Sequence, residues 1–168
     1  MKCRTIALII LCIVPTLCVQ SEPRPNFSGT WILDLQKSRL EIKNSPIASK
    51  FIIKHREPKW HLKRTHIYSG GKHNTWSISL ITDGQHEEVQ HDGSGGQAIT
   101  RMYWDGDVLV LDMRITDARG LTGANVVRYS LSTDGKTMTA LEHEEYPGAK
   151  LTNSWVFEKQ TTAKPVEN

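Results

Sequence analysis

Three arginines, Arg64, Arg101 and Arg128, share the faces of expected strands with apolar residues, and they are the first candidates for binding chemistry. An arginine on an apolar face is costly unless an anion or a carboxylate pairs with it. Tyr103 or Tyr129 could complete the contact with a polar headgroup. The alternative is a reversed strand parity, in which each arginine faces water. Both interpretations stay open at the level of the sequence.

Seven histidines raise the question of a metal site. The densest group of possible ligands is His86-Glu87-Glu88 with His91-Asp92. On a strand His86 and Glu88 share a face while His91 lies on the other, so the group converges only in part. Its spacing matches no closed zinc motif. We expect no metal site here, and we interpret the group as the charged edge of a hairpin.

Signatures of a catalytic nucleophile are absent from the sequence. There is no Gly-x-Ser-x-Gly elbow, and the glycine-rich run 92–96 joins two expected strands without the helix that a phosphate loop needs. We therefore expect no catalytic residue, no cofactor and no enzymatic activity. An enzyme of the same fold would need a histidine beside a carboxylate in a cavity, for instance His66 or His143.

A basic run occupies two successive expected strands. It could meet an anionic surface or headgroup, although such runs are more often the wet face of a sheet, which is the interpretation we favour. Its members are Lys50, Lys54, His55, Arg56, Lys59, His61, Lys63 and Arg64.

The first twenty residues have the pattern of a cleaved signal peptide. Lys2 and Arg4 precede the apolar run 6–14, which is shorter than the roughly 20 residues that span a bilayer. We expect no membrane span and an extracytoplasmic location, periplasmic if the host is a Gram-negative bacterium. All three cysteines, Cys3, Cys12 and Cys18, lie in this segment, so no disulfide is expected in the mature chain.

The remaining chain is expected to form one domain over residues 21–159, followed by a disordered tail over 160–168. Without Lys2 and Arg4 it carries 19 basic and 18 acidic residues, and this balance argues against nucleic acid as a partner. We expect a monomer.

Four Asp-Gly pairs, at 83–84, 92–93, 105–106 and 134–135, separate runs of alternating apolar residues, a pattern typical of hairpin turns. Alternation predicts one buried face for each strand. Helix has little room, and the best candidate is a short turn over 38–43. We predict ten strands over 30–36, 50–56, 59–68, 75–82, 86–91, 97–105, 107–116, 124–132, 137–144 and 150–159. Such a meander closes most simply into an up-and-down antiparallel barrel with an internal cavity.

Two motifs carry a resemblance to a known family. Gly29-Thr30-Trp31 at the first strand resembles the entry motif of calycins, which are the lipocalins and fatty-acid-binding proteins. The run from Ser130 to Met138 and the ending Trp155-Val156-Phe157-Glu158-Lys159 are similar to the last strands of the fatty-acid-binding branch. The chain also resembles uncharacterised secreted bacterial proteins described as lipocalin-like. The resemblance implies a ten-stranded barrel in which the first strand pairs with the last and Trp31 packs across the floor.

The chain departs from that branch at the ligand carboxylate. Where those proteins have an arginine and a tyrosine two apart on the closing strand, this chain has Trp155 and Phe157. The long helical lid does not fit into residues 36–49 either. The resemblance therefore implies a cavity without implying that family's manner of binding fatty acids.

We expect a secreted or periplasmic lipocalin-like barrel that binds a small, mostly hydrophobic molecule without chemistry. The alternatives are a calycin-like enzyme acting on a small bound molecule and a filled barrel with a structural or interaction role. The expected wall of the site comprises Trp60, Trp76, Arg101, Tyr103, Trp104, Met113, Arg128, Tyr129, Trp155 and Phe157.

Overall fold

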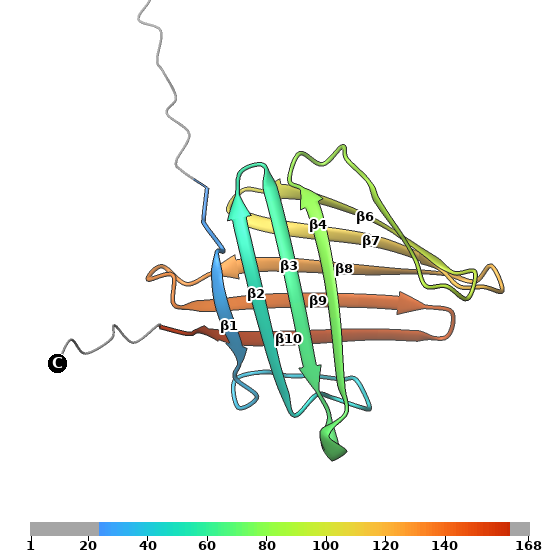
Figure 1. Cartoon of the computed structure of the whole chain (residues 1–168), viewed down its shortest axis with the longest axis horizontal. Helices are drawn as coiled ribbons and strands as arrows, with labels where there is room; N and C mark the ends of the chain where they lie inside the picture. Colours follow the sequence, from blue (N-terminus) through green and yellow to red (C-terminus); the bar gives the residue numbers. More distant parts are fainter. Residues whose placement is uncertain (1–23, 162–168) are drawn as a thin grey trace, which may run out of the picture.

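Ten antiparallel strands make up one sheet in the computed structural model, which describes residues 24–161 (Figure 1). A single 3₁₀ turn, η1 (Ser69–Gly71), joins two of them, and no helix within 24–161 is long and apolar enough to cross a membrane. The all-β prediction is confirmed. The strands are β1 (Gly29–Leu33), β2 (Ala48–Arg56), β3 (Lys59–Ile67), β4 (His73–Ile81), β5 (Glu88–His91), β6 (Gln97–Asp105), β7 (Val108–Thr116), β8 (Thr122–Leu131), β9 (Thr137–Tyr146) and β10 (Ala149–Lys159).

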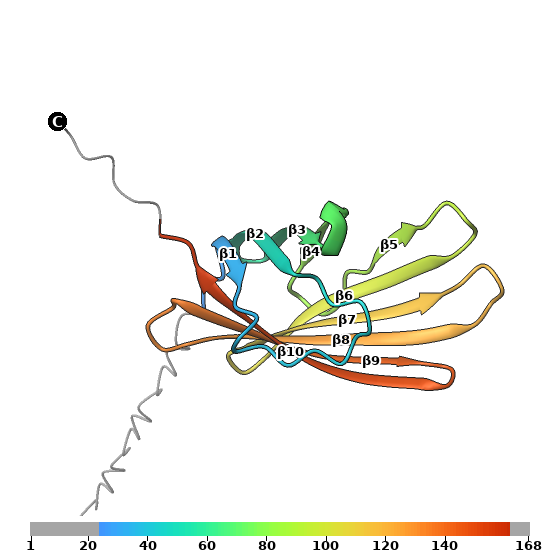
Figure 2. The same cartoon turned by 90° about the horizontal axis from the view of Figure 1, so that it is seen from below.

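The sheet curls into a nearly closed barrel. Its strand order is β4-β3-β2-β1-β10-β9-β8-β7-β6-β5, so β1 pairs with β10 as the calycin resemblance implies. Trp31 lies opposite Lys159 and Leu33 opposite Phe157 in that ladder. Strands β2–β4 cross steeply in front of β7–β10 in Figure 1, which gives the barrel two panels. Figure 2 shows the same sheet from below, with β5 next to β6 at the edge of the sheet.

No backbone ladder joins β4 to β5, the two ends of the sheet. The side chain of Gln90 on β5 bridges them, because its Oε1 accepts a hydrogen bond from Trp76 Nε1 at 3.1 Å and its Nε2 donates to the Ser77 carbonyl at 3.2 Å. Asp83-Gly84 lies in the connection between these strands. This first Asp-Gly pair is therefore not a hairpin turn, whereas Asp105-Gly106 joins paired strands β6 and β7 with Gly106 at φ 59°.

The segment before β2 is extended rather than helical, so the prediction of a helical turn over 38–43 is wrong. Arg39 and Ser154 on β10 exchange two backbone hydrogen bonds, of 2.9 and 2.8 Å, and this bridge replaces the intrahelical bonds of a turn. Leu40 and Ile42 still reach the apolar core. The expected signal peptide, 1–20, and residues 162–168 of the expected tail lie outside the described residues.

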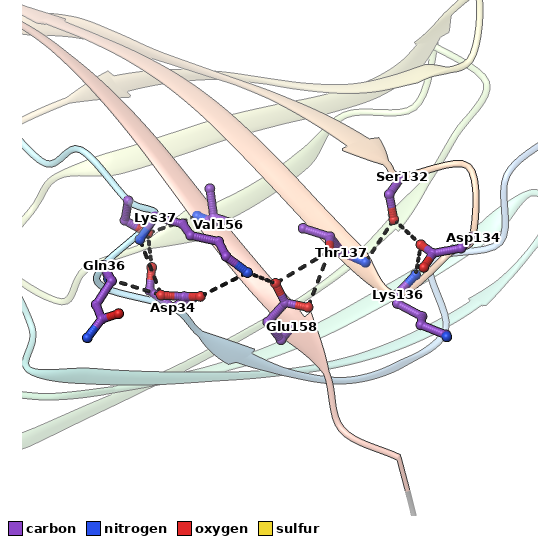
Figure 3. Close-up of polar contacts among 10 residues, drawn as sticks. Asp34, Gln36, Lys37, Ser132, Asp134, Lys136, Thr137, Val156 and Glu158 are labelled. Atoms are coloured by element: carbon purple, nitrogen blue, oxygen red, sulfur yellow. Dashed lines mark hydrogen bonds and ion pairs between the residues drawn. The ribbon is translucent and has the colours of Figure 1, made fainter.

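A polar seam on the outer wall secures the closing strand (Figure 3). Lys37 Nζ lies 2.8 Å from Glu158 Oε1 and 3.3 Å from Asp34 Oδ2. The Ser38 hydroxyl accepts the Val156 N–H at 3.0 Å and donates to the Asp34 carbonyl. These contacts fasten the turn after β1 onto β10.

The closed end of the barrel is a packed aromatic floor. Trp31 is fully buried, and its Nε1 donates to the Phe27 carbonyl at 2.9 Å, which confirms its expected place in the core. Phe27 in turn meets the ring of Trp60 edge-on at 5.5 Å. This floor and the crossing panels leave less internal space than the strand count alone predicts.

Candidate ligand-binding cavity

An internal cavity of about 60 Å³ lies above the floor, between the two panels. Inward-facing residues line it because alternate side chains on each strand point to the same face. The volume accommodates a few water molecules or a small group of ligand atoms. The lining residues are Phe51, Leu62, Arg64, His66, Trp76, Leu111, Met113, Asn125, Val127, Tyr129, Ala140, Glu142 and Trp155.

Arg64 is the cation of this cavity. Its guanidinium carbon lies 5.1 Å from the centroid of the Trp76 ring, a cation–π contact. Its Nε is buried and has no hydrogen-bond partner, and Arg64 forms no ion pair with any residue between 24 and 161. A buried donor without an acceptor carries its full desolvation cost. The fold therefore holds Arg64 half-buried, with its Nε inside the cavity and without an ion pair to a carboxylate of the described residues.

Glu142, the carboxylate of the cavity, is occupied by three donors. Its Oε2 accepts from Trp155 Nε1 at 2.8 Å and from Asn153 Nδ2 at 3.0 Å, while its Oε1 accepts from Asn125 Nδ2 at 2.9 Å. This arrangement aims the amide of Asn125 at the carboxylate and leaves its Oδ1 buried without a partner among the described residues. One inward position further along β9, burial and the neighbouring charge of Glu142 raise the pKa of Glu144.

His66 and Tyr129 complete the polar set as neutral groups. The His66 ring stacks on Trp155 at 5.6 Å, and its Nδ1 lies 2.8 Å from Ser49 Oγ. Burial, with a smaller contribution from the charge of Arg64, lowers the pKa of His66 from 6.5 to about 4. Burial also raises the pKa of Tyr129. At neutral pH the imidazole is uncharged and the phenol keeps its proton, so neither neutralises Arg64.

The expected wall residues fall into three groups. Trp76, Met113, Tyr129 and Trp155 line the cavity. Trp60 and Phe157 also face inward, but they are buried in the core beside it, Trp60 against Tyr129 and Phe157 against Phe51. Trp104 lies at the closed end, where its Nε1 donates to Glu57 Oε1 at 2.9 Å. Contact of any of these residues with a ligand stays a prediction.

The expectation that Arg101, Tyr103 and Arg128 line the interior is wrong, because these residues occupy the alternate strand positions that face outward. Met102 is buried on the inner face of β6, so Arg101 and Tyr103 point outward. Arg101 pairs with Asp112 on the outer wall at 3.0 Å. Arg128 likewise pairs with Asp105 at 2.6 Å, because Val127 and Tyr129 hold the inner positions of β8. Of the three candidate arginines, the structure turns only Arg64 inward.

Several cavity residues were not anticipated as ligand contacts, above all Glu142 and Asn125. The signal for Glu142 was present, because Met138 and Ala140 are inner residues of β9 and the next inner position is 142. Glu142 was not chosen because a charged side chain on a strand is usually exposed to solvent.

No three metal-ligating side chains within residues 24–161 converge on a common point. His86 lies against Asp83 in the β4–β5 connection instead of meeting His91. A histidine and a carboxylate do share the cavity, since His66 and Glu142 both line it. Each is bonded to its own partners, Ser49 for the imidazole and three donors for the carboxylate.

A larger depression, of about 890 Å³, lies at the far ends of β7, β8 and β9. It is open to solvent and mixes inward residues such as Tyr146 with outward ones such as Arg114. The internal cavity is the better candidate site because it combines an enclosing wall with the buried, unpartnered polar atoms Arg64 Nε and Asn125 Oδ1.

No protein-family model matches this chain, and no curated protein sequence matches it. Its fold is similar to that of fatty-acid-binding protein 1 of Echinococcus granulosus, with a TM-score of 0.51 at 11% identity over 80% of this chain and 98% of that one. The structures of a fatty-acid-binding protein from brain tissue of Drosophila melanogaster and of one from Manduca sexta match with TM-scores of 0.47 and 0.44, at 12% and 10% identity. Both alignments cover 77% of this chain and 98% of the other. At 11% identity the likeness to the Echinococcus granulosus structure shows the fold alone, an antiparallel β-barrel.

Proposed function

We propose that this barrel binds a small, mostly hydrophobic molecule in its internal cavity, without chemistry, and that the molecule presents an anionic or acceptor group to Arg64. The observation that carries the proposal is the buried, unpartnered Nε of Arg64 within a wall of apolar and aromatic side chains. A ligand oxygen at this position would supply the missing acceptor.

The charges around Arg64 support an anionic or acceptor group. Glu142 accepts three hydrogen bonds, from Asn125, Asn153 and Trp155, and forms no ion pair with Arg64. His66 is neutral at physiological pH because burial lowers its pKa to about 4. The Arg64 cation is therefore available to a ligand, and Tyr129 lines the same cavity.

The apolar wall supplies the rest of the binding free energy. Phe51, Leu62, Leu111, Met113 and Val127 offer surface that is removed from water on both sides when a ligand enters. The cavity volume of about 60 Å³ restricts the buried portion to a few heavy atoms. A longer molecule has to displace Met113 or Trp76, and the flexible methionine is suited to such a movement.

Binding without chemistry accords with the absence of an activated nucleophile in the cavity. The enzymatic alternative rests on His66 and Glu142, which line the same cavity. The His66 ring bonds Ser49 and makes no hydrogen bond to Glu142, so the two do not form an acid–base pair. We also propose that the mature protein acts outside the cytoplasm as a monomer, and N-terminal sequencing of the protein from its own host tests the export.

The binding proposal is tested with three six-carbon probes: hexanoate, 1-hexanol and hexylammonium. Trp76 and Trp155 line the cavity, so their fluorescence reports occupancy. We expect hexanoate to bind at least about 10-fold more tightly than hexanol, which corresponds to one charge-assisted hydrogen bond of about 1.4 kcal/mol. Arg64→Met should remove this preference while hexanol still binds.

Arg101→Met is the matched control, because it removes a guanidinium from the outer wall. It should keep the preference for hexanoate. Absence of a fluorescence change with any probe would contradict the proposal, and so would a hexanoate preference that survives in Arg64→Met. Turnover of a bound compound by the wild type, lost in His66→Gln, would favour the enzyme.

A further inference from the structure

The chain is nearly neutral as a whole, but its basic and acidic residues are unevenly distributed along the sequence. Between residues 42 and 82 there are eight Lys and Arg residues and one acidic residue, Glu57. Between residues 83 and 161 there are seven Lys and Arg residues and thirteen Asp and Glu residues. The first segment contains β2, β3 and β4, and the second contains β5–β10, so the two panels of the barrel have opposite charge.

Five exposed basic side chains project from the outer surface of β2 and β3. They alternate with the inward-facing residues of these strands, and we call this outer surface the basic face. Its cations are Lys50, Lys54, Arg56, Lys59 and Lys63. The next outward positions, on β4, are Thr75, Ser77 and Ser79, so no carboxylate of the three strands lies among them.

Pairing within the sheet does not account for these cations. Arg56 lies directly opposite Lys59 in the β2–β3 ladder, and like charges in such a pair are destabilising. None of the five forms an ion pair with another residue between 24 and 161. Glu57 does not neutralise them, because its carboxylate is bound at the closed end by His55, Thr82 and Trp104.

In the opposite panel, formed by β5–β10, most basic residues form ion pairs. Five of its seven Lys and Arg residues lie within 4 Å of a carboxylate, namely Arg101, Arg114, Arg119, Arg128 and Lys150. Most cations of this panel are therefore paired, whereas the five of the basic face are all without an ion pair among the described residues. A purely solvated sheet face needs no such one-sided charge.

Apolar residues flank the cations at the η1 end of the basic face. Ile67 is the last outward residue of β3 and is 40% exposed, and the backbone N–H of Ile47, which is 56% exposed, bonds the Ile67 carbonyl at 2.8 Å. Ile32 on β1 is 39% exposed and lies opposite Lys50. In Figure 1 β2–β4 lie side by side on the near side of the molecule, with η1 at their lower end.

A shallow depression of about 500 Å³ opens on the other end of the basic face, toward the β2–β3 turn. Lys54, Arg56, Lys59 and His61 contribute to its rim. Lysine and arginine side chains of this kind donate hydrogen bonds to phosphate oxygens.

We propose that the basic face docks on the surface of an anionic phospholipid bilayer, with the lysines and Arg56 against the headgroups and Ile47 and Ile67 in the interfacial layer. Cations next to exposed isoleucines match a surface that is negative outside and apolar beneath. A linear polyanion would match the charges but would leave the isoleucines in water.

Vesicle flotation tests this docking. Wild-type protein should bind vesicles of phosphatidylcholine with 30% phosphatidylglycerol and should not bind pure phosphatidylcholine, and 0.5 M salt should weaken the binding. Each basic residue contributes about fivefold to such an affinity. Lys54→Glu/Lys63→Glu should therefore weaken binding at least about 25-fold with the thermal unfolding midpoint retained.

The matched control is Lys136→Glu/Lys150→Glu, which makes the same change of net charge on the opposite panel. It should change the affinity by less than about threefold. Ile47→Ser/Ile67→Ser should lower the binding that survives at 0.5 M salt, where screening leaves the apolar contribution.

Four results would overturn the proposal. These are equal binding to neutral and anionic vesicles, an equal loss in the two charge variants, tighter binding to duplex DNA or sulfated polysaccharide than to the anionic vesicles, and a dimer that forms through this face and excludes vesicles. Arg64 faces the interior, so the outcome does not depend on the proposed cavity ligand.

Discussion

Acidification to pH 5 should destabilise this protein through one residue, His66. The ring is 6% exposed, stacked on Trp155 and bonded to Ser49. Burial, and then the charge of Arg64, lowers its pKa from 6.5 in the unfolded chain to about 4 in the folded protein. Between these two values the unfolded chain binds a proton that the folded protein does not bind. The free energy of unfolding therefore falls as pH decreases through this window.

The magnitude follows from the shift. Each pKa unit corresponds to about 1.4 kcal/mol, so the full loss between pH 8 and pH 3 is about 3 kcal/mol, of which about 2 kcal/mol is lost by pH 5. Carboxyl groups with lowered pKa values, such as Asp83 and Glu57, add a loss of the same sign, but mainly below pH 5. Glu144, whose pKa burial raises, contributes with the opposite sign, so the difference between the wild type and a variant without the imidazole isolates the histidine.

Urea denaturation at half-unit steps from pH 8 to 5 measures the effect. His66→Phe keeps an aromatic ring against Trp155 and removes the titrating group, so its free energy of unfolding should be nearly constant over this range. His73→Gln, at an exposed position on β4, should keep the wild-type slope. A wild-type slope that persists in His66→Phe, or a pKa of His66 near 6.5 by NMR titration, would show that the buried-imidazole argument is mistaken.

Three further predictions concern stability. Arg64→Met should raise the free energy of unfolding of the ligand-free protein by about 1–3 kcal/mol in urea, because it removes a buried unpartnered donor, and a loss of stability would contradict this reading of the cavity. Gly123→Ala should lower the free energy of unfolding by about 1–3 kcal/mol in the same assay, because the added Cβ would overlap the Tyr146 ring and lie 2.9 Å from the carbonyl oxygen of residue 145. An unchanged free energy of unfolding would mean that the Tyr146 ring moves aside without cost. Trp76→Phe should speed amide exchange in β5, because it removes the indole bond to Gln90 across the β4–β5 gap, and unchanged exchange would show that this bond does not hold the gap.

Local sequence patterns predicted the elements of this fold well because each pattern reports a local cause. Alternation on β3 reflects one buried face, which correctly placed Trp60, Leu62 and Arg64 on the same side. The Asp105-Gly106 pair reflects a turn that requires positive φ. The extended segment around Arg39 was mistaken for a helical turn because its conformation depends on Ser154, more than a hundred residues away.

The site was predicted less well because alternation shows which residues share a face of a strand but not which of the two faces points into the barrel. A shift of one residue moves a side chain to the other face, and nothing local distinguishes Arg64 from Arg128. Their difference arises from the partners that the barrel brings to each, the Asp105 carboxylate outside for Arg128 and the Trp76 ring inside for Arg64.

The sequence by itself therefore determined an all-β meander and a basic run over residues 50–64, because turn chemistry, alternation and composition are local properties, while the place of Trp31 at the floor came from the resemblance to calycins. The tertiary structure alone decided which arginine faces the interior, which carboxylate is shared among three donors, and that the basic residues of β2 and β3 form a single unpaired face. These are contacts between distant strands, and their free energies depend on burial and on partners that only closure of the barrel provides.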